Sequence, residues 1–197
     1  MSWEKYYDQR VTIPKLLSNL YGQKEFLAEI VARAPGKVLE VGAGTGAMSI
    51  FLAWLGFNVV SIDTNEEVVK NARQTASRLN AKVNFQVADT FKLPYLDQSF
   101  DIIFHQGLLE HFSDEDIGKI LDEQLRVAPV VVLSVPNHRY PRRDFGNERL
   151  MNKNQWDKIL SRYNIVVSKY YSPKIFPKLY LPKTNIQYMA VVMKNVE

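Results

Sequence analysis

The residues best suited to chemistry are three glycines that alternate along the chain after an apolar run. The run is Val38 to Val41, and residues 42–46 read Gly-Ala-Gly-Thr-Gly. Glycines permit a tight turn and let a ligand approach the backbone where a Cβ would collide. This pattern predicts a ligand-binding loop between a buried strand and a helix. Glycines at such a junction can also serve the turn alone.

An acidic residue reinforces the ligand-binding interpretation. Asp63 directly follows the apolar run Asn58 to Ile62. An acid at the carboxyl end of a second strand can accept hydrogen bonds from both hydroxyls of an adenosine ribose, and it can also cap the next helix. Together these features predict an adenosine ligand. They leave its kind open, because the glycines and Ala47 also fit the G-x-G-x-x-A fingerprint of dinucleotide-binding proteins.

A third acid, Asp89, makes the pattern more specific. It lies in an Ala-Asp-x-x-x-Leu-Pro segment, and a Phe-Asp-x-Ile sequence begins at Phe100. With the glycine loop and Asp63, these motifs occur in the order typical of class I S-adenosylmethionine-dependent methyltransferases, which the chain resembles from about Val38 to Asn137. Dinucleotide dehydrogenases lack this combined order. The resemblance implies methyl transfer from S-adenosylmethionine, with S-adenosylhomocysteine as product.

The resemblance also implies a cofactor site. The glycines would lie beneath the methionine moiety, Asp63 would hold the ribose diol, and Asp89 would accept from the adenine amino group. Glu40 would orient the cofactor amino group or the loop. The aromatic N-terminal segment with Trp3 and Tyr6 would either close over the cofactor or pack on the sheet edge. The implied cofactor-binding residues are Tyr7, Arg10, Glu40, Gly42, Ala43, Gly44, Gly46, Asp63, Thr64, Ala88, Asp89, Thr90, Gln106 and Gly107.

The predicted acceptor site is a basic segment, residues 136–149. It follows the fifth strand, and ligands bind outside the carboxyl ends of parallel strands. The candidate acceptor-binding residues are Asn137, His138, Tyr140, Arg142 and Arg143. The arginines either pair with an anionic acceptor or with Asp144 and Glu148. His138 and His111 are the candidate general bases, although His111 in this family more commonly fixes a loop.

The elements that position these residues alternate between apolar runs and segments of helical period, as in an α/β sheet with crossover helices. The predicted strands are 37–41, 58–62, 82–88, 100–106, 129–135, 164–170 and 186–193. The predicted helices are 45–55, 66–79, 114–126 and 153–162, after a helical region at about 14–34. Asn65, Ser113 and Asn152 are predicted N-caps. The resemblance implies a Rossmann-like three-layer sandwich with a seven-stranded sheet in the order 3-2-1-4-5-7-6, the last strand antiparallel.

Composition limits the function further. The 197 residues predict a single domain, with a helical cap at 1–34, a cofactor-binding core at 37–137 and a substrate-side region at 138–197. The absence of cysteine and the presence of three histidines argue against a metal site. No apolar run approaches the roughly 20 residues of a membrane helix, so we expect a cytoplasmic protein.

The charge distribution leaves the acceptor open. Residues 137–197 hold 12 Lys and Arg against 4 Asp and Glu, which fits either a solvated face or an anionic partner. The short loops and the absence of an N-P-P-Y-like motif favour a small-molecule acceptor, possibly anionic, over a nucleic acid. Methylation of a nucleic acid or protein, and cofactor binding without catalysis, are the alternatives. The sequence predicts no oligomeric state.

Overall fold

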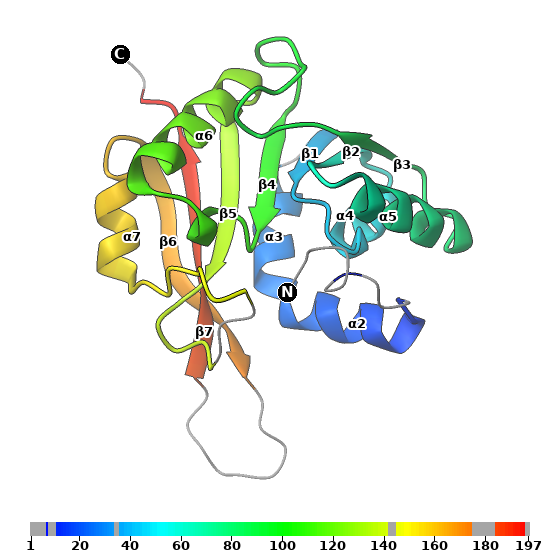
Figure 1. The fold of residues 1–197 in the computed structure, drawn as a ribbon, viewed down its shortest axis with the longest axis horizontal. Coiled ribbons are helices and arrows are strands. Elements are labelled where there is room, and N and C mark those ends of the chain that lie inside the picture. The colour runs from blue at the N-terminus through cyan, green and yellow to red at the C-terminus, as the bar shows by residue number, and fades with distance from the viewer. Residues whose placement is uncertain (1–6, 8–10, 34–35, 142–144, 175–183, 196–197) are drawn as a thin grey trace.

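The computed structural model describes residues 7, 11–33, 36–141, 145–174 and 184–195. Their strands form one seven-stranded sheet in the order β3-β2-β1-β4-β5-β7-β6 (Figure 1). The strands are β1 (Lys37–Val41), β2 (Asn58–Asp63), β3 (Val83–Val87), β4 (Ile102–Gln106), β5 (Val130–Pro136), β6 (Asn164–Lys174) and β7 (Thr184–Met193). The helices are α2 (Ile13–Gly22), α3 (Lys24–Arg33), α4 (Ala47–Trp54), α5 (Glu66–Arg78), η1 (Leu109–His111), α6 (Asp114–Val127) and α7 (Lys153–Leu160).

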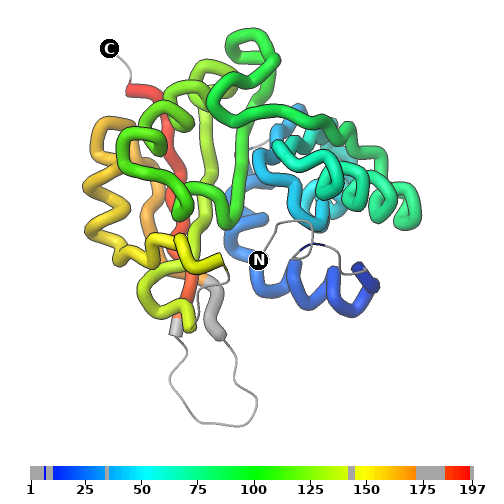
Figure 2. Tube along the Cα trace, in the orientation of Figure 1, coloured from blue at the N-terminus to red at the C-terminus, as the bar shows by residue number. Residues whose placement is uncertain are grey.

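The sheet topology confirms the fold expected from the sequence. Strands β1 to β5 pair in parallel, whereas β7 lies between β5 and β6 and is antiparallel to both. Figure 1 and Figure 2 show β2, β3, α4 and α5 on one side of β4 and the yellow-to-red last part of the chain, with α7, β6 and β7, on the other. The carboxyl ends of the parallel strands therefore meet along one edge, where ligands of such sheets bind.

The described residues form three hydrophobic clusters, of which the two largest hold helices against opposite faces of the sheet. On one face, α2, α3 and α4 pack on residues such as Phe104 and Met189. On the other face, α6 and α7 contribute Leu121, Trp156 and their neighbours to a core with Leu133 and Tyr188. The sheet thus lies between two helical layers, as the predicted three-layer sandwich requires.

The N-termini of three helices confirm the capping residues predicted from the sequence. Asn65, Ser113 and Asn152 are the N-caps of α5, α6 and α7, as predicted, and Asn152 forms a capping box with Gln155. Each side chain accepts a backbone N–H in the first turn, which satisfies a donor that the helix itself leaves unpaired.

Several element boundaries differ from prediction. The helix predicted from residue 45 begins at Ala47, because Gly46 has φ +72° and a left-handed residue cannot continue a right-handed helix. The helical region predicted at 14–34 is two helices, α2 and α3, separated at Gln23. The strand predicted from residue 100 begins at Ile102. The remaining strands agree with their predicted ranges within two residues, apart from β6, which extends to Lys174.

Candidate functional site

The glycine loop joins β1 to α4 at the carboxyl edge of the sheet. Gly42, Gly44 and Gly46 all have positive φ, at +80°, +50° and +72°. A Cβ on Gly46 would lie 2.9 Å from Cζ of Phe85 on β3, so a larger residue there would force Phe85 or the loop to shift. A Cβ on Gly44 would lie 3.0 Å from Cε1 of Tyr7. The third glycine therefore allows close packing on the sheet, whereas Gly44 lies beneath an aromatic side chain from the N-terminal segment.

Asp63 connects this loop to the next helix. Its Oδ2 accepts the N–H of Gly44 at 3.5 Å and its Oδ1 accepts the N–H of Asn65 at 3.0 Å. Burial raises the pKa of Asp63, while these two N–H groups oppose the shift. Asp63 is partly exposed as a residue, and its carboxylate has lone pairs beyond those that these N–H groups use, so it can accept further hydrogen bonds from a ligand on the loop. The helix itself is capped by Asn65 rather than by Asp63.

Glu40 lies beneath the loop. Its side chain is buried, and Oε2 accepts the hydroxyl hydrogens of Ser61 at 2.9 Å and of Ser49 on α4. Burial raises the pKa of Glu40 to about 7, although both hydroxyls act in the opposite direction. These contacts join β1, β2 and α4 beneath the loop, and both roles predicted for Glu40, orienting the loop or the cofactor amino group, stay predictions.

The segment after β3 forms the next part of the edge. Asp89 is exposed and its Oδ1 accepts the N–H of Phe91 at 2.9 Å. Thr90 is buried, and its hydroxyl accepts a hydrogen bond from the side-chain amide of Gln124 on α6 at 3.3 Å. Ala88 is partly exposed, and Thr64, across from it after β2, is exposed. The polar side chains predicted to surround an adenine are thus present on neighbouring strand ends.

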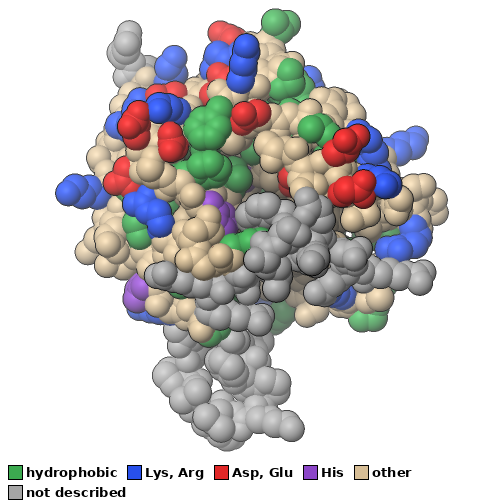
Figure 3. All heavy atoms as spheres, in the orientation of Figure 1, with side chains coloured by type: hydrophobic (Ala, Val, Ile, Leu, Met, Phe, Trp, Pro, Cys, Tyr) green, Lys and Arg blue, Asp and Glu red, His purple; other side chains and the backbone are tan. Residues whose placement is uncertain are grey.

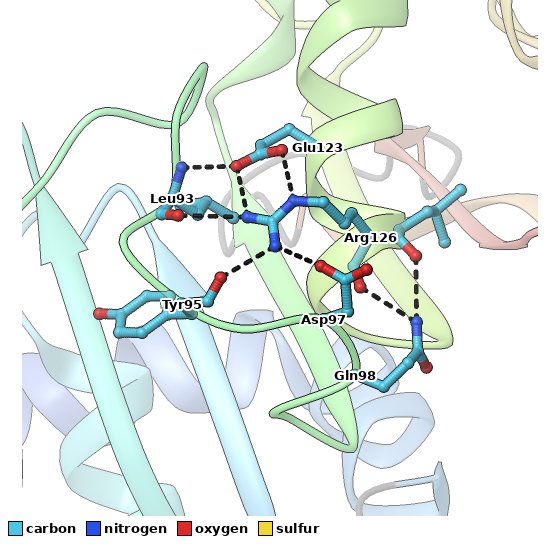
Figure 4. Close-up of polar contacts among 7 residues, drawn as sticks. Leu93, Tyr95, Asp97, Gln98, Glu123 and Arg126 are labelled. Atoms are coloured by element: carbon cyan, nitrogen blue, oxygen red, sulfur yellow. Dashed lines mark hydrogen bonds and ion pairs between the residues drawn. The ribbon is translucent and has the colours of Figure 1, made fainter.

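Arg126 holds the continuation of this segment against α6 (Figure 4). Its guanidinium binds both carboxylate oxygens of Glu123, one oxygen of Asp97, and the carbonyls of Leu93 and Tyr95, at 2.7–3.2 Å. Glu123 in turn accepts the N–H of Leu93 at 2.7 Å. Because an arginine fork can bind several acceptors in fixed directions, residues 93–97 have a defined position without belonging to a strand.

The turn after β4 lies against the glycine loop. Gly107 has φ +71° and donates its N–H to the carbonyl of Ser134 on β5 at 2.9 Å. Cδ1 of Leu108 lies 3.8 Å from the Cβ position of Gly42. Gln106 is partly exposed at the end of β4. The structure therefore brings this turn, the glycine loop and Asp63 to one place.

His111 is fixed by the loop that follows β5. Its Nδ1 lies 2.9 Å from Oδ1 of Asn147, and its ring packs edge-on against Phe145 with centroids 5.9 Å apart. These contacts are those of a loop-fixing residue, the role that the family resemblance favours.

The described part of the predicted acceptor loop divides into anchored and exposed residues. Asn137 is fully buried; its amide donates to the carbonyl of Asn185 at 3.1 Å and accepts the N–H of Arg139 at 2.8 Å. His138 is exposed, with its ring 6.0 Å from that of Tyr170. Tyr140 is partly exposed. The side chain of Asn137 therefore holds the loop to β7, whereas His138 is accessible. Five predicted residues, Trp3, Tyr6, Arg10, Arg142 and Arg143, lie outside the described residues.

Several residues of the site escaped sequence reasoning. Phe85 and Gln124 lie in a strand and a helix that local patterns identify, but their contacts with Gly46 and Thr90 are long-range. Glu110 is buried next to His111. The only sign of this in the sequence is that an acidic residue stands within an otherwise largely apolar segment, residues 108–112.

Neither a metal cluster nor a membrane span is evident in the part of the chain that the structure describes. It contains no group of three or more potential metal ligands among His, Cys, Asp and Glu. His105 is buried in β4, and burial lowers its pKa to about 3, so it is neutral. Among the same residues, every helix is too short or too polar to cross a bilayer.

Comparison with known proteins agrees with this geometry. A family model described as a methyltransferase domain matches residues 38–129. Norajmaline N-methyltransferase from Rauvolfia serpentina is 34% identical over 52% of this chain and 37% of its own length. Phosphoethanolamine N-methyltransferase 1 from Arabidopsis thaliana is 33% identical over 47% of this chain and 19% of its own length. The chain thus spans well under half the length of these two relatives.

A solved structure shows the same fold over nearly the whole chain. Magnesium protoporphyrin IX methyltransferase from Synechocystis PCC 6803, with bound S-adenosylhomocysteine, superposes with a TM-score of 0.71 and 19% identity, covering 98% of this chain and 93% of that one. The strand order with an antiparallel β7 differs from the all-parallel 3-2-1-4-5-6 order of dinucleotide-binding domains. The matching domain, the motif order and the fold thus all agree with those of the class I S-adenosylmethionine-dependent methyltransferases, which the sequence resembles.

Proposed function

We propose that the protein transfers a methyl group from S-adenosylmethionine to a small-molecule acceptor. The observation that carries this proposal is the joint between the glycine loop and Asp63, whose carboxylate accepts the Gly44 N–H and stays partly exposed at the ends of β1 and β2. A ribose diol placed on this carboxylate would leave the rest of an adenosyl ligand over the glycines. When bound, the cofactor supplies an electrophilic methyl group on a sulfonium.

The residues present fit such a ligand. Gly42 and Thr45 of the loop are partly exposed, whereas Gly44 has φ +50° and is covered by the ring of Tyr7, which would therefore lie next to the ligand. Asp63 would hold the ribose hydroxyls, and Asp89 and Thr90 the adenine. Because the methyl group is already activated, the main task of the protein is to align the acceptor with it. The residues that we propose to contact the cofactor are Tyr7, Gly42, Ala43, Gly44, Asp63, Thr64, Ala88, Asp89, Thr90, Gln106 and Gly107, with Arg10 proposed from the sequence alone.

Ion pairing of the basic last third supports a small acceptor over a nucleic acid. Arg149 pairs with Asp114, Arg162 with Asp122, and Lys169 with two glutamates of α3. Exposed pairs of this kind add little stability, but each reduces the local positive charge that a phosphate backbone requires. Figure 3 agrees for the face that it shows, where Lys and Arg side chains are interspersed with Asp and Glu. The relatives named above include two N-methyltransferases of small molecules by their names, which supports the same class.

The test is a calorimetric titration with S-adenosylmethionine, S-adenosylhomocysteine and NAD. We expect the two adenosyl ligands to bind and NAD not to bind. Asp63→Ala should weaken both by at least about tenfold, because hydrogen bonds to a charged group contribute roughly 1.5–3 kcal/mol. Asp122→Ala, which removes an exposed carboxylate on α6, is the matched control and should bind like the wild type.

Each other result has a definite meaning. Failure of both adenosyl ligands to bind the folded wild-type protein would refute the cofactor assignment, and binding of NAD would restore the dinucleotide interpretation. Binding of S-adenosylmethionine with no methylation of a broad panel of small molecules, peptides and RNA would favour cofactor binding without catalysis.

A further inference from the structure

Glu110, in the turn after β4, is a buried carboxylate with an oxygen that has no partner. The residue is 3% exposed, and its Oε2 makes no hydrogen bond. Its Oε1 lies 3.9 Å from Nε2 of His111, which is longer than a hydrogen bond, and 3.5 Å from the Cβ position of Gly107. Buried polar atoms are nearly always paired, and an unpaired carboxylate oxygen is costly. Such an atom in a native fold calls for a ligand or a proton.

Among the described residues no lysine or arginine pairs with this carboxylate, and His111, which is charged only when protonated, lies 3.9 Å from its Oε1. Arg149 donates its backbone N–H to the Glu110 carbonyl at 2.9 Å, but its guanidinium binds the Phe112 carbonyl and Asp114. The nearby Glu148 is negative itself, and its two oxygens accept the N–H groups of Phe145 and Gly146 at 2.6 and 2.8 Å. The electrostatic environment of Glu110 therefore favours a hydrogen-bond donor, especially a cationic one, and disfavours an anion.

The position of Glu110 connects this environment to the candidate cofactor site. The turn that carries it begins at Gly107, directly after β4, and Leu108 of the same turn contacts the glycine loop at Gly42. Ligands of parallel sheets bind at this edge. A group held by Glu110 would therefore lie on the same side of the sheet as a ligand over the glycines.

We infer that the Glu110 carboxylate binds the amine of the methyl acceptor, so that the substrate class is a small primary or secondary amine. This inference rests on the proposed function. An acceptor amine arrives mainly as an ammonium and must lose a proton before its lone pair can attack a methyl group. The ammonium N–H would donate to Oε2, and the proton would pass to it, leaving a neutral amine and a neutral carboxylic acid.

The electrostatics of Glu110 suit this proton transfer. Burial first, and Glu148 second, raise the pKa of Glu110 to about 8, against an ordinary value of 4.5. An alkylammonium such as that of lysine has a pKa of about 10.4 in water, and burial lowers it. The pKa of the bound ammonium and the pKa of Glu110 can therefore become similar, which permits the proton transfer. His111 and Glu148 are the other titratable side chains that face Glu110, and the carboxylate of Glu148 is held in its charged form by its N–H donors.

The inference is tested by binding rather than by turnover. Ethylammonium, ethanol and acetate are titrated into ¹⁵N-labelled protein with and without saturating S-adenosylhomocysteine, and the amide resonances of Gly107, Glu110 and Arg149 are followed. We expect saturable shifts with ethylammonium alone. Glu110→Gln keeps the shape and removes the carboxyl group that can ionise against the ammonium, and it should weaken ethylammonium binding at least tenfold while S-adenosylhomocysteine binds as before. Glu115→Gln, an exposed carboxylate on α6, is the matched control and should behave like the wild type.

Two results would overturn the inference: ethylammonium binding no better than ethanol or acetate, or equal binding by the wild type and Glu110→Gln. If the wild-type protein did not bind S-adenosylhomocysteine, this would instead refute the proposed function. Ethylammonium binding without the nucleoside would then still report on Glu110 itself. The variant should stay folded, because glutamine has the same shape as the neutral, protonated form of Glu110, and its circular dichroism spectrum checks this.

Discussion

The packing of Gly46 on Phe85 allows a quantitative prediction for Gly46→Ala. A Cβ at this position would lie 2.9 Å from Cζ of Phe85 and 3.3 Å from Cβ of Ala72, with φ at +72°. The left-handed conformation destabilises the folded state of the alanine variant by about 1–2 kcal/mol. Alanine also lowers the conformational entropy of the unfolded chain, which offsets about 0.4–1 kcal/mol of this loss. Overpacking against Phe85 adds about 1–3 kcal/mol. We therefore expect the free energy of unfolding to fall by roughly 2–4 kcal/mol.

A second glycine separates the two contributions. Gly56, just after α4, also has a positive φ, +91°, but no atom lies within 4 Å of its Cβ position. Gly56→Ala should therefore carry the conformational cost without the overpacking, and we expect a loss of only about 0.5–1.5 kcal/mol.

Urea unfolding, followed by circular dichroism, measures both variants. The difference between them should be about 1–3 kcal/mol, and the melting temperature of Gly46→Ala should fall by roughly 5–15 °C for a domain of this size. Equal losses in the two variants would show that Phe85 and α4 move apart at little cost. The argument that the third glycine is there for packing would then be wrong.

Two further predictions concern Glu40 and Asn152. The pKa of Glu40 is raised from 4.5 to about 7, so between these pH values the folded protein binds more protons than the unfolded chain and stability falls as pH rises. Glu40→Gln removes this contribution, and its stability in urea relative to the wild type should rise with pH, by at most about 1.4 kcal/mol per unit; parallel curves would contradict the assigned burial effect. Asn152→Ala removes the capping box of α7 and should cost about 1 kcal/mol in the same assay, whereas an unchanged midpoint would mean that α7 is held by Trp156 alone.

The sequence was sufficient for most of the fold because its signals are local. Strands buried on both faces appear as continuous apolar runs, as in Ile102 to Phe104, and the caps at Asn65 and Asn152 precede their helices directly. The order of the strands in the sheet was predicted in another way. It came from the family resemblance, because the apolar runs do not show which strands are neighbours.

The parts that were missed depend on contacts between distant segments. The start of α4 depends on the left-handed conformation of Gly46. Phe85 of β3 packs closely on this residue and leaves little room for a side chain there. The burial of Glu110 depends on the loop around Arg149, and the anchoring role of Asn137 depends on Asn185 of β7. A side chain of the right type near the right strand end was therefore predictable, but whether it faces a ligand or fastens a loop was not.

The anchoring of Asn137 bears on how a protein with the proposed function can diversify. Its side chain joins the end of β5 to β7, and the N–H of Gly107 joins the turn after β4 to Ser134. The glycine loop and Asp63 make their contacts with β1, β2 and α4 instead. Insertions beyond Arg139 can therefore lengthen or reshape the loop after β5. The start of that loop, the glycine loop and Asp63 would keep their positions. That loop is the place where directed evolution for new acceptors should begin.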